Sequence, residues 1–348
     1  YKTLNSLIVF HNSFNMQNHL KTVLVTGASG YIASHCIKVL LEKGFKVKGS
    51  VRDLKKLDIS KNFFDNLSNK ENLEFCELNL LSDRGWNAAV KDCDYLMHVA
   101  SPCIIKEPKK ESEIINPAVE GTLRALNFAK NSNIKKVILT SSIGAMLYGN
   151  KKQNCEPSDW TNISEYVGSY IKSKTMAEKA AWNYFNNLSN PSFSFTTINP
   201  GMVFGPVINR NLDGVSQNMI LNLIKGQYPV LPDIYFTVAD VRDVAKIHVE
   251  ALLKMESDNL RLIVTSEQSI SFIEISRTLK KIGFKKCPTK LIPSFLIKFL
   301  ALFNKDMRIT SMMIKKGSFA VDISKTISIF NWVPIPLEKT LLDMTKSF

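Results

Sequence analysis

Short apolar runs alternate along most of the chain with longer segments that have helical periodicity. The run 23–25 stops at a turn residue, Gly27, and the segments 116–130 and 168–187 carry apolar side chains at helical spacing. Strands that alternate with helices predict a parallel sheet with right-handed crossovers and helices on both faces. We therefore expect an α/β fold, a doubly wound parallel sheet that binds ligands at the carboxyl ends of its strands.

Residues 21–53 contain the most informative pattern, a strand, a glycine turn, a helix and a second strand. Gly27, Gly30 and Ala33 have the spacing G-x-x-G-x-x-A. Gly27 can adopt the positive φ of a tight turn, and Gly30 lets the backbone approach a pyrophosphate at the helix N-terminus. This order and length are typical of a dinucleotide-binding βαβ unit, although a glycine turn alone occurs in any α/β protein.

The end of the second strand bears on which dinucleotide is bound. Arg52 comes first there, followed by Asp53, Lys55 and Lys56. A guanidinium group matches a ribose 2′-phosphate, whereas an NAD site usually places an acid against the 2′-hydroxyl. We therefore predict NADP(H). The alternative is that Arg52 is a solvated charge at the strand end and Asp53 binds the ribose.

The remainder of the chain predicts two lobes. We expect an N-terminal appendage at 1–20, a dinucleotide-binding Rossmann domain at 21–202 plus 235–265, and a smaller C-terminal substrate lobe at 203–234 plus 266–348. The segment 292–303 reads as an amphipathic helix, and we expect its apolar face to pack on a lobe rather than lie on a membrane.

Composition excludes several classes of protein. The formal net charge is +14, but the lysines and arginines are spread along the chain without interleaved aromatic residues, which argues against a nucleic-acid surface. The six cysteines show no C-x-x-C pair, so we predict neither a metal site nor a disulfide framework. The longest apolar stretch is too short to span a bilayer, and 1–20 lacks the order of a signal peptide, so we expect a cytoplasmic location.

Three residues suggest the chemistry. Ser142 ends a predicted strand, and Tyr170 and Lys174 lie four residues apart on a predicted helix, so that the phenol and the ammonium share a face. A nearby cation lowers the pKa of a phenol toward neutral, and a hydroxyl can donate to a carbonyl oxygen. Together they would polarise a C=O group, with Tyr170 as proton donor and a reduced nicotinamide as hydride donor. Y-x-x-x-K alone is more often a surface pair, but here it follows a nucleotide-binding unit.

At this point the chain resembles the extended short-chain dehydrogenase/reductases, and within them the dihydroflavonol reductase and cinnamoyl-CoA reductase branch. The resemblance covers 21 to the C-terminus. It rests on VTGASGYIASH, VRD at 51–53, GW at 85–86, DYLMHVASP, TSSIGA, DW at 159–160, YIKSKTMAEKAAW, INPGMVFGP and VADVRDVAKIHVEAL.

The resemblance implies site residues. It makes Ser142, Tyr170 and Lys174 the catalytic set, with Ser142 preferred to its neighbour Ser141. It also implies a cofactor site, for which we predict Gly27, Ser29, Gly30, Tyr31, Ile32, Arg52, Lys56, Asn79, Leu80, Val99, Ala100, Ser101, Tyr170, Lys174, Pro200 and Val203.

Three positions depart from the family pattern. Ala33 replaces the commoner third glycine, and Asn79 replaces the aspartate that meets the adenine, so binding there is expected to persist but weaken. Leu147 falls near a polar substrate-reading position of the plant dihydroflavonol reductases, which argues against a flavonoid substrate.

We therefore predict an NADPH-dependent oxidoreductase that reduces an aldehyde or ketone to an alcohol. The alternatives are a 3β-hydroxysteroid dehydrogenase or nucleotide-sugar epimerase of the same superfamily, and a regulator that senses NADP(H) without turnover. The expected partner is a small carbonyl substrate, with no nucleic acid and no membrane, in a monomer or homodimer.

Other residues are predicted to serve the structure. His98 and His248 lie in apolar segments and are expected to pack in the core. Asp240, Arg242 and Asp243 match a family motif and are expected to hold the two lobes together.

Overall fold

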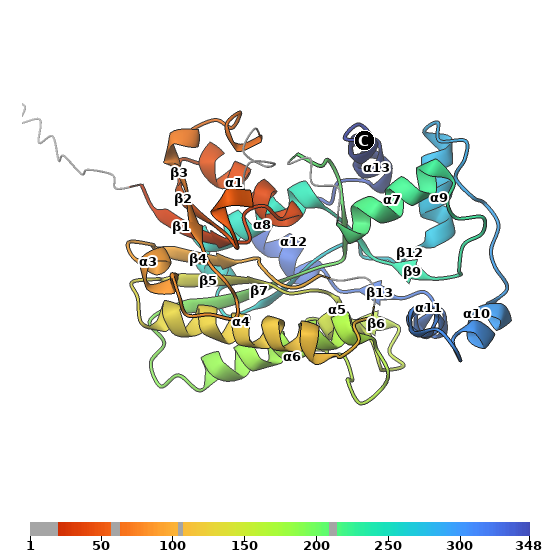
Figure 1. Ribbon diagram of the computed structural model, residues 1–348, viewed down its shortest axis with the longest axis horizontal. Helices are drawn as coiled ribbons and strands as arrows, with labels where there is room; N and C mark the ends of the chain where they lie inside the picture. The colour runs from red at the N-terminus through yellow and green to blue at the C-terminus, as the bar shows by residue number, and fades with distance from the viewer. Residues whose placement is uncertain (1–19, 57–62, 104–106, 209–213) are drawn as a thin grey trace, which may run out of the picture.

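The computed structural model describes residues 20–56, 63–103, 107–208 and 214–348, so the predicted appendage lies almost wholly outside the described residues. The central sheet is parallel, and its strand order β11-β7-β5-β4-β1-β2-β3 is that of a doubly wound fold (Figure 1), which confirms the prediction. Its strands are β1 (Thr22–Thr26), β2 (Lys46–Val51), β3 (Leu73–Glu77), β4 (Tyr95–His98), β5 (Lys136–Thr140), β7 (Ser194–Pro200) and β11 (Arg261–Val264).

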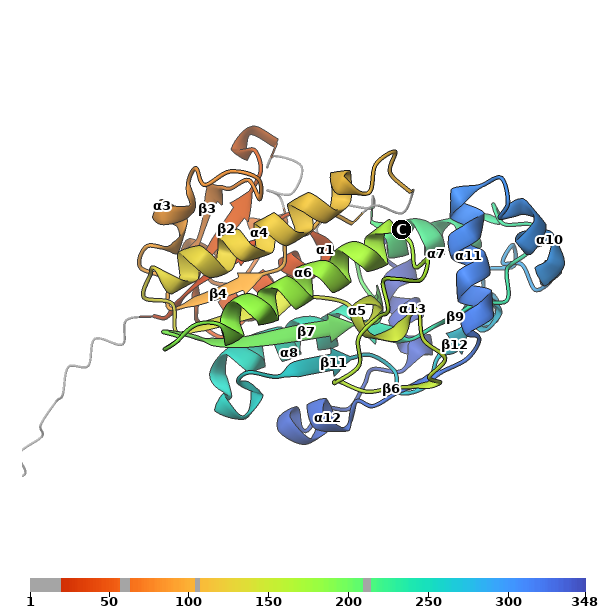
Figure 2. The ribbon, with the colours of Figure 1, turned by 90° about the horizontal axis from the view of Figure 1, so that it is seen from below.

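Helices cover both faces of this sheet (Figure 2). One face carries α1 (Tyr31–Glu42), α8 (Val241–Leu253) and α12 (Ser324–Phe330), and the other carries α3 (Trp86–Val90), α4 (Ser112–Lys130) and α6 (Ser169–Asn186).

The alternation of side chains along a strand explains the two layers. Val23 and Val25 of β1 belong to the apolar cluster beneath α1 and α8, whereas Leu24 belongs to the cluster beneath α4 and α6. All three side chains are fully buried, as expected for a parallel sheet covered on both faces.

A third apolar cluster forms a separate core toward the C-terminus. It is centred on Phe204, Ile220, Ile275 and Leu341. The lobe boundaries predicted from the sequence stay a prediction. The elements of this region and its connections are α5 (Gly144–Leu147), β6 (Asn154–Cys155), β8 (Met202–Phe204), α7 (Val215–Lys225), β9 (Tyr235–Phe236), β10 (Val238–Asp240), β12 (Ile270–Ser271), α9 (Phe272–Lys281), α10 (Ser294–Leu300), α11 (Lys305–Lys316), β13 (Ala320–Val321) and α13 (Leu337–Thr345).

Asp240, at the end of β10, and Arg242 and Asp243, on α8, bind the C-terminal segment that contains α13, while their expected role between two lobes stays a prediction. Arg242 Nη1 donates to Asp343 at 2.7 Å, and Asp240, which caps α8, accepts from the Thr340 hydroxyl at 2.7 Å. Asp243 accepts from the backbone N–H of Ile335 at 2.8 Å.

The helix predicted at 292–303 forms as α10, but its expected packing is wrong. Ile297 is buried, whereas Phe295, Phe299 and Phe303 are 69%, 59% and 78% exposed. No helix in the described part of the chain has both the length and the apolar character needed to cross a bilayer.

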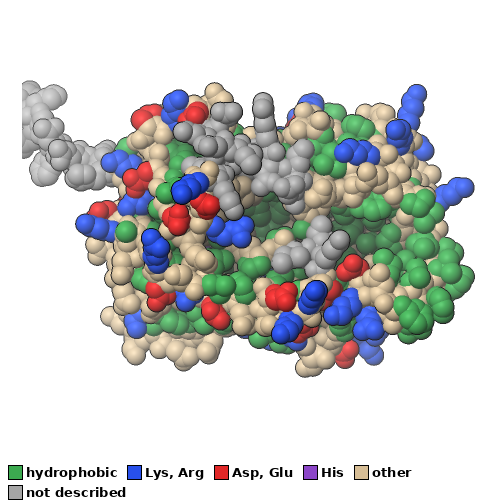
Figure 3. Space-filling view, in the orientation of Figure 1, with side chains coloured by type: hydrophobic (Ala, Val, Ile, Leu, Met, Phe, Trp, Pro, Cys, Tyr) green, Lys and Arg blue, Asp and Glu red, His purple; other side chains and the backbone are tan. Residues whose placement is uncertain are grey.

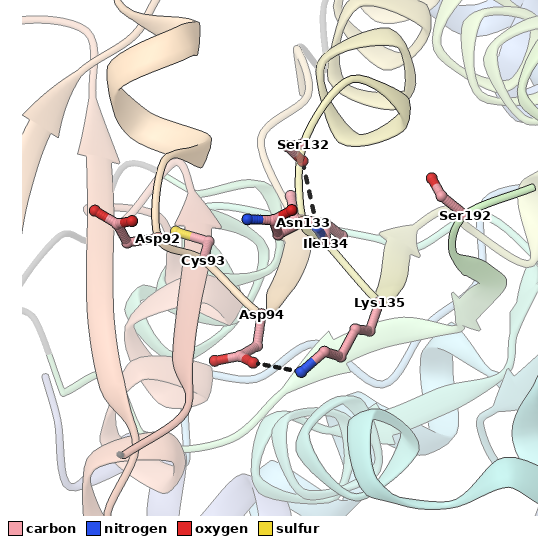
Figure 4. A pocket seen from close by; sticks show the side chains of 8 residues that line it. All are labelled: Asp92, Cys93, Asp94, Ser132, Asn133, Ile134, Lys135 and Ser192. Carbon is pink, nitrogen blue, oxygen red and sulfur yellow. Dashed lines mark hydrogen bonds and ion pairs between the residues drawn. The ribbon is translucent and has the colours of Figure 1, made fainter.

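A shallow pocket lies at the amino edge of the sheet (Figure 4), where Asp94 precedes β4 and Lys135 precedes β5. Lys135 donates to Asp94 at 3.0 Å, and the second oxygen of Asp94 accepts from the N–H of Thr22 at 3.0 Å. These contacts fasten the amino ends of three strands, so the pocket is at the edge opposite the predicted chemistry.

Candidate active site

The glycine turn after β1 has the geometry that its spacing predicted. Gly27 has φ +72°, and a Cβ there would lie 3.1 Å from Cα of Ala100. The N–H of Gly30 donates to the carbonyl of Gly27 at 2.8 Å, which closes the turn directly before α1. Ala33 is fully buried beneath the turn. A side chain at position 27 would therefore displace the β4 loop, and only glycine fits both constraints.

A threonine hydroxyl joins the ends of β1 and β4. Oγ1 of Thr26 accepts from the N–H groups of Val99 at 3.1 Å and Ala100 at 3.0 Å. The same oxygen lies 2.9 Å from Nδ1 of His98. His98 is buried, and burial, with the Lys174 cation as a second cause, lowers its pKa to about 3. His98 is thus a neutral core residue, as predicted, and so is His248, which lies 2.8 Å from the Thr140 hydroxyl.

The predicted cofactor residues lie at or just beyond the carboxyl ends of the strands, on the side of the sheet that we call its carboxyl edge. Arg52 follows β2 and is exposed, while Asp53 accepts from the N–H of Lys55 at 2.9 Å. Asn79 follows β3, is exposed, and accepts from the N–H of Leu81 at 2.9 Å. The others stand beside them: Ser29 and Gly30 in the turn, Tyr31 and Ile32 at the start of α1, Lys56 in a short 3-10 helix, Leu80 after β3, Val99 to Ser101 after β4, Pro200 at the end of β7 and Val203 in β8.

These residues fit a dinucleotide. Gly27 keeps the turn free of a side chain that would crowd Ala100, and the first turn of α1 offers backbone N–H groups with no acidic side chain among them, as a pyrophosphate site needs. Arg52 stands at the strand end where an adenosine ribose would lie. The hydroxyl of Tyr31 donates to the carbonyl of Gly205 at 2.8 Å, so it also ties α1 to the segment after β8.

Ser142 and Tyr170 come together at the same edge, from β5 and α6. The phenol of Tyr170 lies near the Ser142 hydroxyl, which lowers the pKa of the phenol. The neighbouring Ser141 is turned away, because its hydroxyl donates to the buried carboxylate of Glu178 at 2.5 Å. The N–H of Gly144 donates to Oγ of Ser142 at 3.0 Å, which orients that hydroxyl.

Two ionisable groups of α6, Tyr170 and Lys174, are strongly desolvated. Burial raises the pKa of Tyr170 well above its ordinary value, with the Cys103 thiol as the next cause, although the nearby Ser142 hydroxyl lowers it. Burial lowers the pKa of Lys174, against the attraction of Cys103 and Glu178. The expected fall in the pKa of Tyr170 is therefore wrong, because desolvation of the phenol outweighs its favourable partners. Tyr170 consequently holds its proton at neutral pH.

The start of α6 is fixed from outside the sheet. Glu107 accepts from the N–H of Ser169 at 2.8 Å and from its hydroxyl at 2.6 Å, one residue before Tyr170. The N–H of Glu107 in turn donates to Asp306 of α11 at 3.3 Å. The helix that carries Tyr170 is thus positioned by both the sheet and α11.

Sequence reasoning missed a buried polar network one turn beyond Lys174. Glu178 accepts from Asn199 Nδ2 at 2.7 Å and from Arg261 Nε at 2.7 Å, and Asn199 also donates to the carbonyl of Ser142 at 3.2 Å. Glu178 shares the helix face of Tyr170 and Lys174 at a spacing of four residues. A glutamate in that register was a visible signal, but its partners come from two distant strands.

Sequence reasoning also missed Cys103. Its thiol lies near the Tyr170 phenol; desolvation of the sulfur raises the pKa of the thiol, while Lys174 and Tyr170 lower it. As a whole residue Cys103 is nevertheless exposed, unlike the other five cysteines, all of which are described, so the desolvation concerns its sulfur atom. Its place two residues after Ser101, in a loop at the strand end, was the available signal.

The position directly after β7 also requires a glycine, because the chain there is closely packed. A Cβ on Gly201 would lie 2.0 Å from Oγ1 of Thr265 and 2.5 Å from the carbonyl oxygen of Thr237. The backbone of 200–203 therefore packs directly on two threonines. Figure 3 shows the molecular surface hollowed beside this edge, with hydrophobic side chains in the hollow.

A doubly wound sheet with a glycine turn after β1, and a serine, a tyrosine and a lysine at the same edge, is the arrangement of a dinucleotide-dependent oxidoreductase. Residues 23–263 match the NAD dependent epimerase/dehydratase family. The chain belongs to this family.

Relatives place the chain among its reductases, as the resemblance predicted. It is 35% identical over 290 residues to cinnamoyl-CoA reductase CAD2 of Medicago truncatula, covering 78% of this chain and 82% of that protein. It is 32% identical over 268 residues to NADPH-dependent methylglyoxal reductase GRE2 of Saccharomyces cerevisiae, covering 70% and 78%. The structure of Gre2 from Candida albicans in complex with NADPH has a TM-score of 0.76 and 27% identity, covering 94% of this chain and 98% of that one.

Proposed function

We propose that this protein uses NADPH to reduce the carbonyl group of a small aldehyde or ketone to an alcohol, with Tyr170 as the proton donor. The observation that supports this role is that Ser142 lies beside the Tyr170 phenol, whose pKa is raised, at the carboxyl ends of the strands where the glycine turn also lies. The class of enzyme follows from the relatives, which are reductases, one of them named as NADPH-dependent. The chain is accordingly an NADP(H)-dependent oxidoreductase.

Each residue then has a definite task. Ser142 donates its hydroxyl to the carbonyl oxygen of the substrate and draws electron density from the carbonyl carbon. Tyr170 holds a proton at Oη and gives it to the same oxygen as negative charge develops there. When bound, the reduced nicotinamide supplies the hydride. Lys174, one turn along the same helix face, places a cation where it favours the phenolate that Tyr170 becomes.

Arg52 decides between the two nicotinamide cofactors. It is exposed at the end of β2, beside Asp53, whose carboxylate already accepts from the N–H of Lys55. A guanidinium group would bind a 2′-phosphate through two parallel hydrogen bonds. Gly27, Gly30 and the first turn of α1 would hold the pyrophosphate.

The test is a kinetic assay with a binding control. Purified protein is given NADPH and a panel of aldehydes and ketones, and absorbance of the cofactor is followed for the wild type and for Tyr170→Phe. We expect net NADPH consumption by the wild type and a loss of about 10²–10⁴-fold in kcat for the variant. NADPH binding, followed by fluorescence, should be the same in both.

Two results would count against the proposal. Unchanged turnover in Tyr170→Phe would remove the tyrosine from its role. Tight NADPH binding without any net consumption would favour an epimerase, which recycles its cofactor, or a sensor. The matched control is Tyr166→Phe, an exposed tyrosine four residues earlier, which should leave turnover unchanged.

A further inference from the structure

The surface of α10 and the turn after it is apolar on its outward side. Ile297 faces inward and is almost fully buried, and residues on the opposite side of this helix are the exposed ones. Phe299 and Phe303 contact each other edge to face, with ring centroids 5.7 Å apart. We call this surface the α10 face; its exposed members are Leu291, Phe295, Leu296, Phe299, Leu300, Leu302 and Phe303.

Neighbouring polar contacts hold the turn that carries part of the α10 face in one conformation. Asn304 accepts from the N–H of Asp306 at 2.8 Å and so caps α11 directly after Phe303. Arg308 donates to the carbonyl of Ala301 at 2.9 Å and to that of Leu302 at 3.3 Å. Backbone and side-chain contacts therefore hold Leu302 and Phe303 outward in a defined turn.

Positive charge surrounds these apolar side chains. Between 285 and 316 the chain has eight basic residues and a single acid, Asp306. Three of the cations belong to the face itself or its edge: Lys298 on α10, and Lys305 and Arg308 on the first turn of α11. Within the described residues, no carboxylate lies within ion-pair distance of these three.

The α10 face lies at one extremity of the molecule. Both ribbon views place α10 at the end of the long axis, on the side away from β1 to β3 (Figures 1 and 2). In the space-filling view the same end carries a continuous group of hydrophobic side chains, with lysines and arginines around it (Figure 3).

We propose that the α10 face binds the surface of a bilayer that contains anionic phospholipids. Phenylalanine and leucine side chains on a helix that lies in the interface would enter the boundary between headgroups and acyl chains. The lysines and arginine around them would face the anionic headgroups, each adding about fivefold to the partition constant. This departs from the expectation of no membrane partner, which assumed that the helix packs on a lobe.

A second copy of the chain fits this surface less well. An isologous dimer would bring the α10 face against itself, and would oppose lysines and arginines of one copy to those of the other. A stable protein interface also uses about 20 to 30 residues on each side, far more than a short helix and its turn provide. An anionic bilayer complements the positive charge of the α10 face and does not require a large contact surface.

The experiment is sedimentation of the full chain with vesicles. One vesicle population is phosphatidylcholine, and the other is phosphatidylcholine with phosphatidylserine at roughly seven to three. We expect the protein to pellet with the second population and to remain in the supernatant with the first. Raising the salt concentration should weaken binding, because it screens the headgroup charge.

Two variants remove one part of the surface each. Phe295→Ser, Phe299→Ser and Phe303→Ser together should reduce binding at least about tenfold, since the inserted side chains are lost. Lys298→Glu with Lys305→Glu should abolish the preference for phosphatidylserine. The matched control replaces exposed apolar residues elsewhere, Leu253, Met255 and Val333, by serine and should bind as the wild type does.

NADPH binding and turnover serve as the folding check, because none of these residues belongs to the site at the sheet edge. Absence of binding to phosphatidylserine vesicles, or equal binding by the triple serine variant, would overturn the proposal. So would a dimer, detected by analytical ultracentrifugation, that the triple variant converts to a monomer.

Discussion

The Nε atom of Arg261 donates to the carboxylate of Glu178 at 2.7 Å; the Glu178 side chain is fully buried and that of Arg261 is 11% exposed. Arg261 opens β11 at the edge of the sheet, and Glu178 lies one turn beyond Lys174 on α6. The ion pair thus joins the last strand of the sheet to the helix that carries the proposed proton donor. If this carboxylate lost its cationic partner, its charge would remain unpaired and desolvated, which strongly destabilises a folded protein.

Removing one member of this pair should therefore destabilise the protein strongly. Arg261→Met leaves the Glu178 charge buried and uncompensated, and we expect the free energy of unfolding to fall by about 3–5 kcal/mol. Denaturant titration followed by tryptophan fluorescence measures it. The control is Lys38→Met, which breaks the exposed pair of Lys38 with Glu42 and should cost less than about 1 kcal/mol. Equal losses in the two variants would contradict the buried-pair interpretation.

Ser141 and Ser142 provide a matched pair for separating catalysis from stability. Ser142→Ala removes the hydroxyl that meets Tyr170, and kcat should fall about 10²-fold with NADPH affinity unchanged. Ser141→Ala removes a donor to Glu178 and should cost about 1–2 kcal/mol of stability while kcat per folded molecule is retained. Steady-state kinetics and unfolding curves on both variants check this. An exchange of the two phenotypes would assign the catalytic role to Ser141.

Arg52 should control the choice of cofactor. Arg52→Ala removes the guanidinium proposed to meet the 2′-phosphate, and the kcat/KM ratio of NADPH over NADH should fall about ten- to a hundredfold. Lys55→Ala, three residues on, should change this ratio little. A wild type that prefers NADH would show instead that Asp53 binds the ribose.

Three buried histidines should make the protein unstable in acid. Burial lowers the pKa of His35 to about 4, of His98 to about 3 and of His248 to about 4. Above pH 6.5 both folded and unfolded forms are neutral, whereas below it only the unfolded form takes up protons. Stability should therefore fall with decreasing pH by about 4 kcal/mol per unit between roughly pH 6 and pH 5.

The contribution of a single histidine to this slope can be isolated. His98→Gln should reduce the slope by about 1.4 kcal/mol per pH unit in the same range, because one proton fewer is bound on unfolding. Denaturant titrations at several pH values provide the measurement. An unchanged slope would mean that His98 is protonated in the folded protein.

Cys103 should make the enzyme sensitive to thiol reagents. Alkylation at the thiol that meets Tyr170 would block the site, and inactivation should accelerate above neutral pH because the pKa of Cys103 is raised. Cys103→Ala should resist inactivation and keep most of its activity, while Cys76→Ala, at a half-buried cysteine far from Tyr170, should behave as the wild type. Inactivation of Cys103→Ala at the wild-type rate would place the reactive thiol elsewhere.

The sheet could be predicted from the sequence because its signals are local. Glycine 27 turns the chain directly after β1, and the strands end at small or polar residues that stop an apolar run. Tyr170 and Lys174 share a face through helix geometry alone. The network around Glu178 could not be predicted, since Asn199 and Arg261 reach it only after strands distant in sequence pair in the sheet.

The pKa of Tyr170 and the packing of α10 show a different limit. A cation four residues away suggested a lower pKa for the phenol, but desolvation in the folded protein, which spacing does not reveal, raises it. Helical periodicity in 292–303 indicated an apolar face, but it carries no information about which protein surface, if any, covers that face. Both depend on tertiary structure.

During synthesis of the chain, the central sheet is completed only when its outermost strand, β11, has been made. β7 gains its outer neighbour only when residues 261–264 have been made, 83 positions after Glu178. Until then a growing chain has an open strand edge at β7 and a carboxylate on α6 that lacks its arginine. A protein that stops before β11 would carry both defects permanently, so we expect nonsense truncations in this region to be cleared by cellular proteases even though every proposed catalytic residue is present.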